Sequence, residues 1–114
     1  MANIKRLESD LHHALTEILR EEMKDPDIGF ITISDVDLTN DLSYLTIHYT
    51  VFEDAGTKRE TAQKALERSH SFIRTALAQR VDIRKMPQLR FRYDESLERS
   101  ERIREGLKKV MNDE

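Results

Sequence analysis

The sequence predicts a single α+β domain, residues 1–114, in which a three-stranded sheet packs against helices. Two observations predict it. In several stretches apolar residues recur at three- and four-residue steps, which is typical of amphipathic helices. In other, shorter stretches apolar and polar residues alternate, as they do in half-buried strands. Along the chain the order is helix, strand, strand, long or broken helix, strand, helix.

The first helix is predicted over residues 4–23. Lys24-Asp25-Pro26 and then Gly29 end it, because proline disfavours the helical conformation of the residue before it. The apolar residues of the helix share one stripe: Ile4, Leu7, Leu11, Ala14, Leu15, Ile18, Leu19 and Met23.

A β-hairpin is predicted next, with strands around residues 30–38 and 45–51 joined at Thr39-Asn40-Asp41. The alternation of the first strand slips by one residue in its middle, so that a bulge near Ser34–Asp35 is needed to keep its apolar residues on one face. The apolar residues expected on that face are Ile31, Ile33, Val36 and Leu38, then Leu45, Ile47, Tyr49 and Val51.

The next helical stretch, residues 57–82, is interrupted in its middle. Thr57-Lys58-Arg59-Glu60 has the pattern of a capping box, with which helices begin. The small polar residues Ser69-His70-Ser71 fall on or beside the apolar stripe, which predicts a break or a sharp bend there. The apolar positions expected to face the core are Ala62, Ala65, Leu66, Phe72, Ile73, Ala76, Leu77 and Val81.

The last strand and the closing helix complete the order. Pro87 marks the start of a strand over residues 88–93, with Leu89, Phe91 and Tyr93 inward and Arg90 and Arg92 outward. A helix that begins at Asp94 or Ser96 is predicted from the apolar residues Leu97, Ile103, Leu107, Val110 and Met111.

The charge is polarised along the chain. The overall net charge is −3, but the segment 68–92 carries seven cations against the single acid Asp82, a net +6 that leaves −9 for the remainder. An ordinary solvated face is the plainer interpretation of such a run. Because the run is almost free of acids in an otherwise acidic chain, we expect it to bind an anionic partner.

The residues needed for catalysis or metal binding do not converge in this sequence. Cysteine is absent, and His12 and His13 are adjacent in a helix and therefore point apart. The neighbours Ser69 and His70 cannot face each other as nucleophile and base either. We expect no enzymatic activity, no cofactor and no metal. The sequence has no apolar run of the ~20 residues that span a bilayer and no secretory signal, so we expect a cytoplasmic protein.

The element order is that of a type II KH domain, and the motifs resemble the ribosome-binding factor A family. The resemblance extends from about Leu7 to Leu107. The motifs that carry it are Lys24-Asp25-Pro26, Val36-x-Leu38-x-x-Asp41-Leu42, Leu66-Glu67-Arg68-Ser69-His70-Ser71-Phe72-Ile73-Arg74, Leu77, Ile83-Arg84 and Pro87-x-Leu89-x-Phe91-x-Tyr93-Asp94-x-Ser96.

The resemblance implies a KH-like fold whose helices kink at a small residue, and a protein that binds 16S ribosomal RNA in immature small (30S) subunits. It further implies a role in late maturation and rRNA processing, above all in the cold. The glycines Gly29, Gly56 and Gly106 form no Gly-x-x-Gly loop, so the usual KH clamp on nucleotides is not expected. The family often has Ala-x-Gly where this chain has Ser69-His70-Ser71, and its long charged C-terminal tail has no counterpart before Glu114.

The expected partners are 16S rRNA and free 30S subunits, with no membrane and no small-molecule substrate. Since one core uses all the apolar stripes, we expect a monomer. A KH-like protein-interaction module without direct RNA binding is the alternative. The candidate RNA-binding residues are Arg68, Ser69, His70, Ser71, Arg74, Arg80, Arg84, Lys85, Arg90 and Arg92, with Lys5 and Arg6 as a second contact.

Overall fold

The computed structural model describes residues 3–23, 25–28, 31–51 and 56–96 of the chain. Through these ranges it follows the predicted order of helices and strands. The predicted closing helix lies outside the described residues beyond Ser96.

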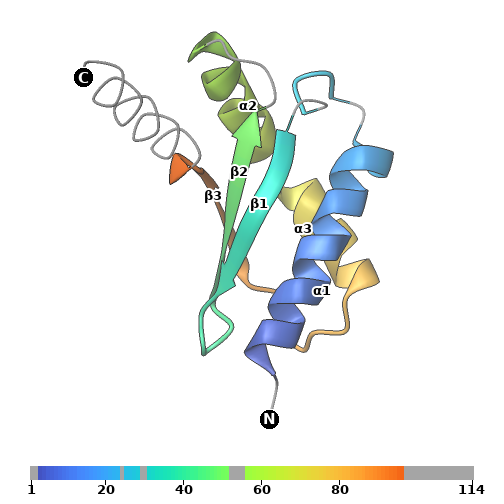
Figure 1. The fold of residues 1–114 in the computed structure, drawn as a ribbon. Helices are drawn as coiled ribbons and strands as arrows, with labels where there is room; N and C mark the ends of the chain where they lie inside the picture. The colour runs from blue at the N-terminus through green and yellow to red at the C-terminus, as the bar shows by residue number, and fades with distance from the viewer. Residues whose placement is uncertain (1–2, 24, 29–30, 52–55, 97–114) are drawn as a thin grey trace, which may run out of the picture.

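Three strands form one mixed sheet in the order β1-β2-β3 (Figure 1). β1 (Ile31–Leu38) runs antiparallel to β2 (Tyr44–Val51), and β3 (Gln88–Tyr93) runs parallel to β2. The described helices pack on one face of this sheet, and none of them covers the other face (Figure 1). The α+β class predicted from the sequence is confirmed.

The first helix ends in an unusual turn. α1 (Ile4–Glu17) begins at Asn3, whose Oδ1 accepts a hydrogen bond from the backbone N–H of Arg6 at 3.2 Å. It continues as the π-helix η1 (Ile18–Glu22), which closes with the N–H of Met23 donating to the carbonyl oxygen of Ile18 at 3.2 Å. π-turns of this kind are often found beside functional sites.

The hairpin contains the predicted bulge. The register of β1 against β2 shifts between Ile33 and Asp35, so that Ile33, Val36 and Leu38 are all buried. Ile31, at the start of the strand, is half-buried.

The long helical stretch is broken, as predicted. α2 (Gly56–Arg68) and α3 (His70–Arg80) meet at Ser69, which has φ −94° and ψ 4°. The expectation that Phe72 faces the core is wrong, since this side chain is 50% exposed. The stripe of Ile73, Ala76 and Leu77 faces the core and leaves Phe72 on the flank of α3.

β3 is an edge strand whose two ends are tied to its neighbours. At its C-terminal end the N–H of Asp94 donates to the carbonyl oxygen of Tyr49 at 2.7 Å. The hydroxyl of Ser34, at the bulge of β1, donates to Asp94 Oδ2 at 2.6 Å, and this bond is the main reason that the pKa of Asp94 is lowered to about 2. Asp94 Oδ1 also accepts from the N–H of Ser96, at the predicted start of the closing helix.

One cluster of aliphatic side chains joins the helices to the sheet. Leu11, Leu15 and Ile18 come from the first helix, Leu66 and Leu77 come from α2 and α3, and all of them are fully buried. Within the described ranges, no helix has the length and apolar character that crossing a membrane requires.

Candidate nucleic-acid interface

Three of the predicted RNA-binding arginines are held by internal partners. Arg68, at the end of α2, donates from Nε at 2.9 Å and from Nη2 at 2.5 Å to Asp25, and from Nη2 at 3.0 Å to Asp27. The hydrogen bonds to Asp25 and Asp27 raise the pKa of Arg68. The pKa of Asp25 is lowered, chiefly by the hydrogen bond from the backbone N–H of Asp27 and next by the one from Arg68. The contacts of Arg68 connect the α2–α3 break to the turn that follows η1.

Arg80 and Arg74 also have internal contacts. Arg80 Nη1 pairs with Glu17 at 2.7 Å and its Nη2 with Glu22, which joins the end of α3 to the first helix. The hydrogen bond to Glu22 is the main reason that the pKa of Arg80 is raised. Arg74 donates to the carbonyl oxygens of Met86 at 2.9 Å and Pro87 at 3.2 Å, and thereby holds the segment that leads into β3.

A second set of cations faces solvent. Arg84, Lys85 and Arg92 are exposed and have no ion-pair partner among the described residues. Arg90 is also exposed, and its guanidinium carbon lies 3.7 Å from the centre of the Tyr44 ring. Such stacking fixes an arginine in position and leaves its N–H donors free. We call Arg84, Lys85, Arg90 and Arg92 the β3 cations.

A hollow lies beside Arg90 and Arg92, between β3 and the α2–α3 break. It measures about 320 Å³ and its lining includes His70, Arg90 and Arg92. A wider hollow of about 710 Å³ shares Gln63, Glu67 and Phe91 with it, so the two form one groove along α2 and β3. The polar side chain in the middle is Gln63, which donates to the carbonyl oxygen of Phe91 at 3.1 Å.

Aromatic side chains line the wider part of the groove. The rings of Tyr49 and Tyr93 meet edge to face with centroids 5.7 Å apart, and Arg59 lies 4.2 Å above the Tyr93 ring. The Tyr49 hydroxyl donates to Gln63, and burial raises the pKa of Tyr49 to about 12. The sequence pattern does not reveal this groove. Its only signal was the inward parity of Phe91 and Tyr93 on a strand at the edge of the sheet.

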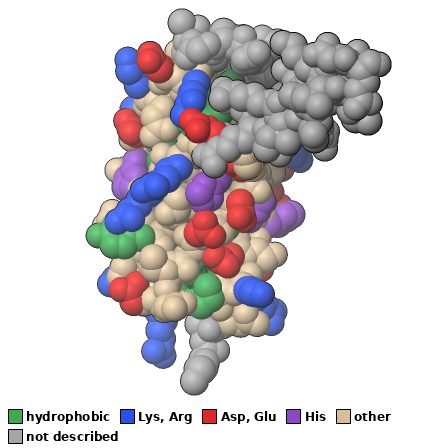
Figure 2. Space-filling model, turned by 60° about the vertical axis from the view of Figure 1, so that its left-hand side comes forward, with side chains coloured by type: hydrophobic (Ala, Val, Ile, Leu, Met, Phe, Trp, Pro, Cys, Tyr) green, Lys and Arg blue, Asp and Glu red, His purple; other side chains and the backbone are tan. Residues whose placement is uncertain are grey.

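The face of the sheet that no described helix covers carries both acidic and basic side chains (Figure 2). Arg92 is paired in register with His48 of β2, which itself pairs with Asp37 of β1 at 2.8 Å. Figure 2 shows acidic side chains gathered in the middle of this face, with histidine and basic side chains beside them. The acidic side chains of such a face repel an anionic polymer, and its basic side chains attract one.

The remaining predicted residues lie at the α2–α3 break and at the start of α1. Ser69 is the break itself, and Ser71 is exposed in the first turn of α3. Lys5 and Arg6 are exposed in the first turn of α1, at the same end of the molecule as the segment 81–87 that carries Arg84 and Lys85 (Figure 1).

Replacing Arg80 with glutamine should separate the internally paired arginines from the exposed ones. We expect Arg80→Gln to lower the midpoint of thermal unfolding at low salt, because Glu17 and Glu22 lose their partner. The loss should shrink as salt screens the ion pairs. Arg84→Gln is the matched control and should leave the midpoint unchanged. If Arg80→Gln folds as stably as the parent but no longer binds its anionic partner, Arg80 belongs to the binding surface.

Comparisons with known proteins give one consistent result. A family model described as ribosome-binding factor A matches residues 3–107. The ribosome-binding factor A of Shewanella sediminis is 37% identical over 96% of this chain and 77% of its own length. That of Halothermothrix orenii is 39% identical over 96% of this chain and 89% of its own length.

Solved structures agree with the sequence matches. The crystal structure of ribosome-binding factor A from Thermus thermophilus aligns with a TM-score of 0.72 at 32% identity, covering 80% of this chain and 94% of that one. A homology model of the Thermus thermophilus factor, fitted into the cryo-EM map of a 30S complex, aligns with a TM-score of 0.65 at 31% identity, covering 79% of this chain and 93% of that one.

Proposed function

Because this chain belongs to the ribosome-binding factor A family, we propose that it binds 16S rRNA in the immature 30S subunit and promotes late maturation of that subunit. The family consists of non-enzymatic ribosome maturation factors, so the prediction that the chain is not an enzyme is confirmed by membership. The related Thermus thermophilus factor has been fitted into the map of a 30S complex, which supports the choice of subunit.

The observation that carries the proposal is the separation of the arginines into two sets. Arg68, Arg74 and Arg80 are used inside the fold. The β3 cations are exposed: Arg90 and Arg92 lie on β3 beside a groove, and Arg84 and Lys85 lie in the segment that leads into β3. Intramolecular contacts explain the first set, whereas no acid among the described residues pairs with the second set. Unpaired, exposed cations are the arrangement expected of a surface that binds phosphate.

The groove suggests how the RNA is held. The planar guanidinium groups of Arg90 and Arg92 are suited to phosphate oxygens on the outer side of β3. The groove behind them has His70 at one end and Tyr93, covered by Arg59, at the other. An unpaired base can stack there on the His70 ring or on the Arg59 guanidinium. The β3 cations would then set position and orientation, while the groove selects single-stranded RNA over a regular duplex.

The wider biological role follows the family. The chain acts in the cytoplasm as a monomer, on free 30S subunits and not on intact ribosomes. It assists rRNA processing. Cells that lack it should be impaired most in the cold, because RNA rearrangements are slower there.

Binding to purified 30S subunits should depend strongly on salt. If all of the β3 cations contact phosphates, the logarithm of the binding constant should fall with the logarithm of salt concentration with a slope of about −3 to −4. This corresponds to roughly a 100-fold loss of affinity between 50 and 200 mM salt. Sedimentation with isolated 30S subunits over a salt series measures it. A slope close to zero would favour a protein-interaction module over an RNA-binding protein.

A further inference from the structure

The hollow beside the α2–α3 break has one carboxylate among its cations. Glu67, in the last turn of α2, lines this hollow of about 320 Å³ together with His70, Arg90 and Arg92. The charge of Glu67 offsets that of one arginine and so weakens the attraction of the hollow for phosphate. Phosphate binding therefore does not account for Glu67, whereas a ligand that donates hydrogen bonds would.

Glu67 has acceptor capacity left for such a ligand. Its Oε1 accepts one hydrogen bond, at 3.0 Å, from Nε2 of Gln63, one turn earlier on α2. The same nitrogen donates to the carbonyl oxygen of Phe91 at 3.1 Å, so the amide that holds Glu67 is itself anchored to β3. Among the described residues no cation pairs with Glu67 and its Oε2 has no hydrogen-bond partner. Since a carboxylate offers about four acceptor positions, about three remain.

The size and the walls of this hollow suit one unpaired base. A cavity of about 150 Å³ is large enough for benzene, so a hollow of about 320 Å³ can admit a two-ring purine. Leu89 and Phe91 supply apolar contact, and the half-buried ring of His70 supplies a surface for stacking. Glu67 is exposed, so a base that enters the hollow can reach its carboxylate.

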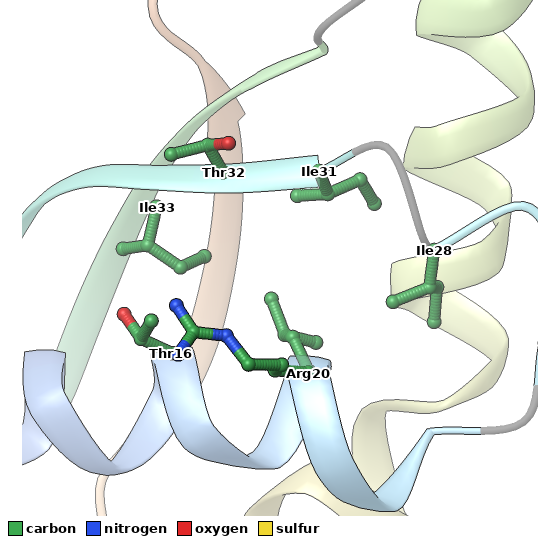
Figure 3. Close-up of a pocket in the computed structure, with 7 residues that line it drawn as sticks. Thr16, Arg20, Ile28, Ile31, Thr32 and Ile33 are labelled. Atoms are coloured by element: carbon green, nitrogen blue, oxygen red, sulfur yellow. The ribbon is translucent and has the colours of Figure 1, made fainter.

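The hollow between the first helix and the start of β1 is a less suitable site (Figure 3). It measures about 220 Å³, and its walls include Leu19, Ile28 and Ile33, which are at most 8% exposed. Main-chain groups beside it are already bonded: the carbonyl oxygen of Ile33 to His12 at 3.1 Å, and the N–H of Ile31 to the carbonyl oxygen of Ile28 at 3.0 Å. The hollow at the α2–α3 break, by contrast, has exposed polar side chains in its walls.

We propose that Glu67 makes the hollow at the α2–α3 break select guanine among the bases of a bound single strand, an inference that rests on the proposed function. The two carboxylate oxygens accept hydrogen bonds from N1–H and from the N2 amino group of guanine. The base stacks on His70, and Arg90 and Arg92 hold the flanking phosphates.

The donor pattern of guanine is what distinguishes it from the other bases. On its Watson–Crick edge two donors lie side by side, which matches the two oxygens of a carboxylate. Adenine and cytosine present one amino group beside a ring nitrogen that accepts, and uracil presents one N–H between two carbonyl oxygens. Each of these three bases therefore sets a lone pair against one oxygen of Glu67 and leaves that oxygen without a donor.

Short RNAs of the sequence UUUXUUU test the assignment, with binding to the whole chain measured by fluorescence anisotropy. With guanine at X the Kd should be about tenfold lower than with adenine, cytosine or uracil, since a bidentate contact discriminates between bases by about this factor or more. Inosine keeps N1–H but lacks the amino group, so it should lose most of the preference. The guanine heptamer should also shift the NMR signals of the Gln63 side-chain amide, because this amide donates to Glu67.

Glu67→Gln should remove the preference for guanine, because the glutamine amide offers one acceptor and one donor to a pair of donors. The affinity for the other heptamers should not fall, since the substitution removes a negative charge that repels phosphate. Glu60→Gln is the matched control. It removes the same charge from an exposed position of α2 that lines only the wider hollow, and it should keep the preference.

Three outcomes would overturn the inference. Equal affinities for the guanine and adenine heptamers, or a preference that survives Glu67→Gln, would mean that Glu67 does not read the base, while RNA binding itself would stand. GMP that binds as tightly as the guanine heptamer would mean that the hollow takes a free nucleotide. If no heptamer binds, the hollow is not a base site, and the salt dependence of 30S binding decides separately whether the chain contacts RNA.

Discussion

Reversing the charge of the β3 cations is expected to remove most of the affinity for 30S subunits. In the variant Arg84→Glu, Lys85→Glu, Arg90→Glu and Arg92→Glu, binding should fall by at least about 100-fold at moderate salt, because each lost phosphate contact also removes its release of counterions. The fold should persist, since these side chains are exposed and exposed substitutions typically change the free energy of unfolding by no more than about 0.5 kcal/mol each. Sedimentation and thermal unfolding measure the two quantities.

In the control variant the charges of Lys108 and Lys109 are reversed by substitution with glutamate. Both residues lie outside the described residues and outside the basic segment 68–92. This control should bind 30S subunits far more tightly than the β3 variant. Cells that contain only the β3 variant should accumulate unjoined small subunits, more severely in the cold. If the β3 variant binds as tightly as the parent, the β3 cations are ordinary surface charge and the interaction-module alternative takes precedence.

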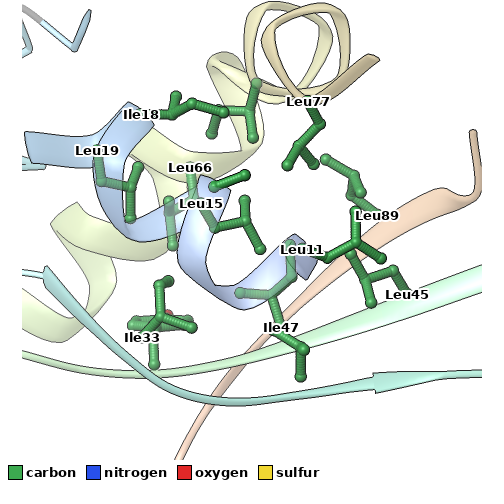
Figure 4. Close-up of a cluster of buried hydrophobic side chains, with 14 of the residues drawn as sticks. Leu11, Leu15, Ile18, Leu19, Ile33, Leu45, Ile47, Leu66, Leu77 and Leu89 are labelled. Carbon is green, nitrogen blue, oxygen red and sulfur yellow. The ribbon is translucent and has the colours of Figure 1, made fainter. Parts of the chain in front are cut away.

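The largest effect on stability is expected from truncating the centre of the core. Leu15 is fully buried, and Figure 4 shows it pointing from α1 into the cluster with Leu11 and Leu66. Leu15→Ala should lower the free energy of unfolding by about 2–5 kcal/mol, because the helix and the sheet cannot close the cavity that it leaves. The whole free energy of unfolding of a small domain is typically only about 5–15 kcal/mol. Urea unfolding of the purified variant measures the loss.

Leu7→Ala is the control for this substitution, since Leu7 lies on the same helix but is only half-buried. Leu7→Ala should lower the free energy of unfolding clearly less than Leu15→Ala does. Equal losses for the two variants would mean that α1 does not pack on the sheet through Leu15 as described.

Two irregular features of the fold could be predicted from the sequence because each leaves a local mark. The slip in parity between Ile33 and Val36 indicated the bulge, and the small polar residues at Ser69–Ser71 indicated the break between α2 and α3. Phe72 was misplaced because it borders the apolar stripe of α3, and which of the bordering positions is buried depends on what α3 packs against.

The division of the arginines could not be predicted in the same way. Arg80 pairs with Glu17 across 63 residues of sequence, and Arg68 pairs with Asp25 across 43. Both contacts depend on tertiary packing, and a run of cations looks the same whether or not its members are paired. The groove between α2 and β3 has the same origin, because it exists only once Gln63 has been brought to the edge strand.

Cross-linking from β3 tests the central claim most directly. A photoreactive amino acid placed at Arg92, on the exposed side of β3, would be activated in the complex with purified 30S subunits, with the same group at His13 on α1 as the control. The account predicts cross-links from position 92 to 16S rRNA, and few or none from position 13. Cross-links from position 92 that lead only to ribosomal proteins would contradict it.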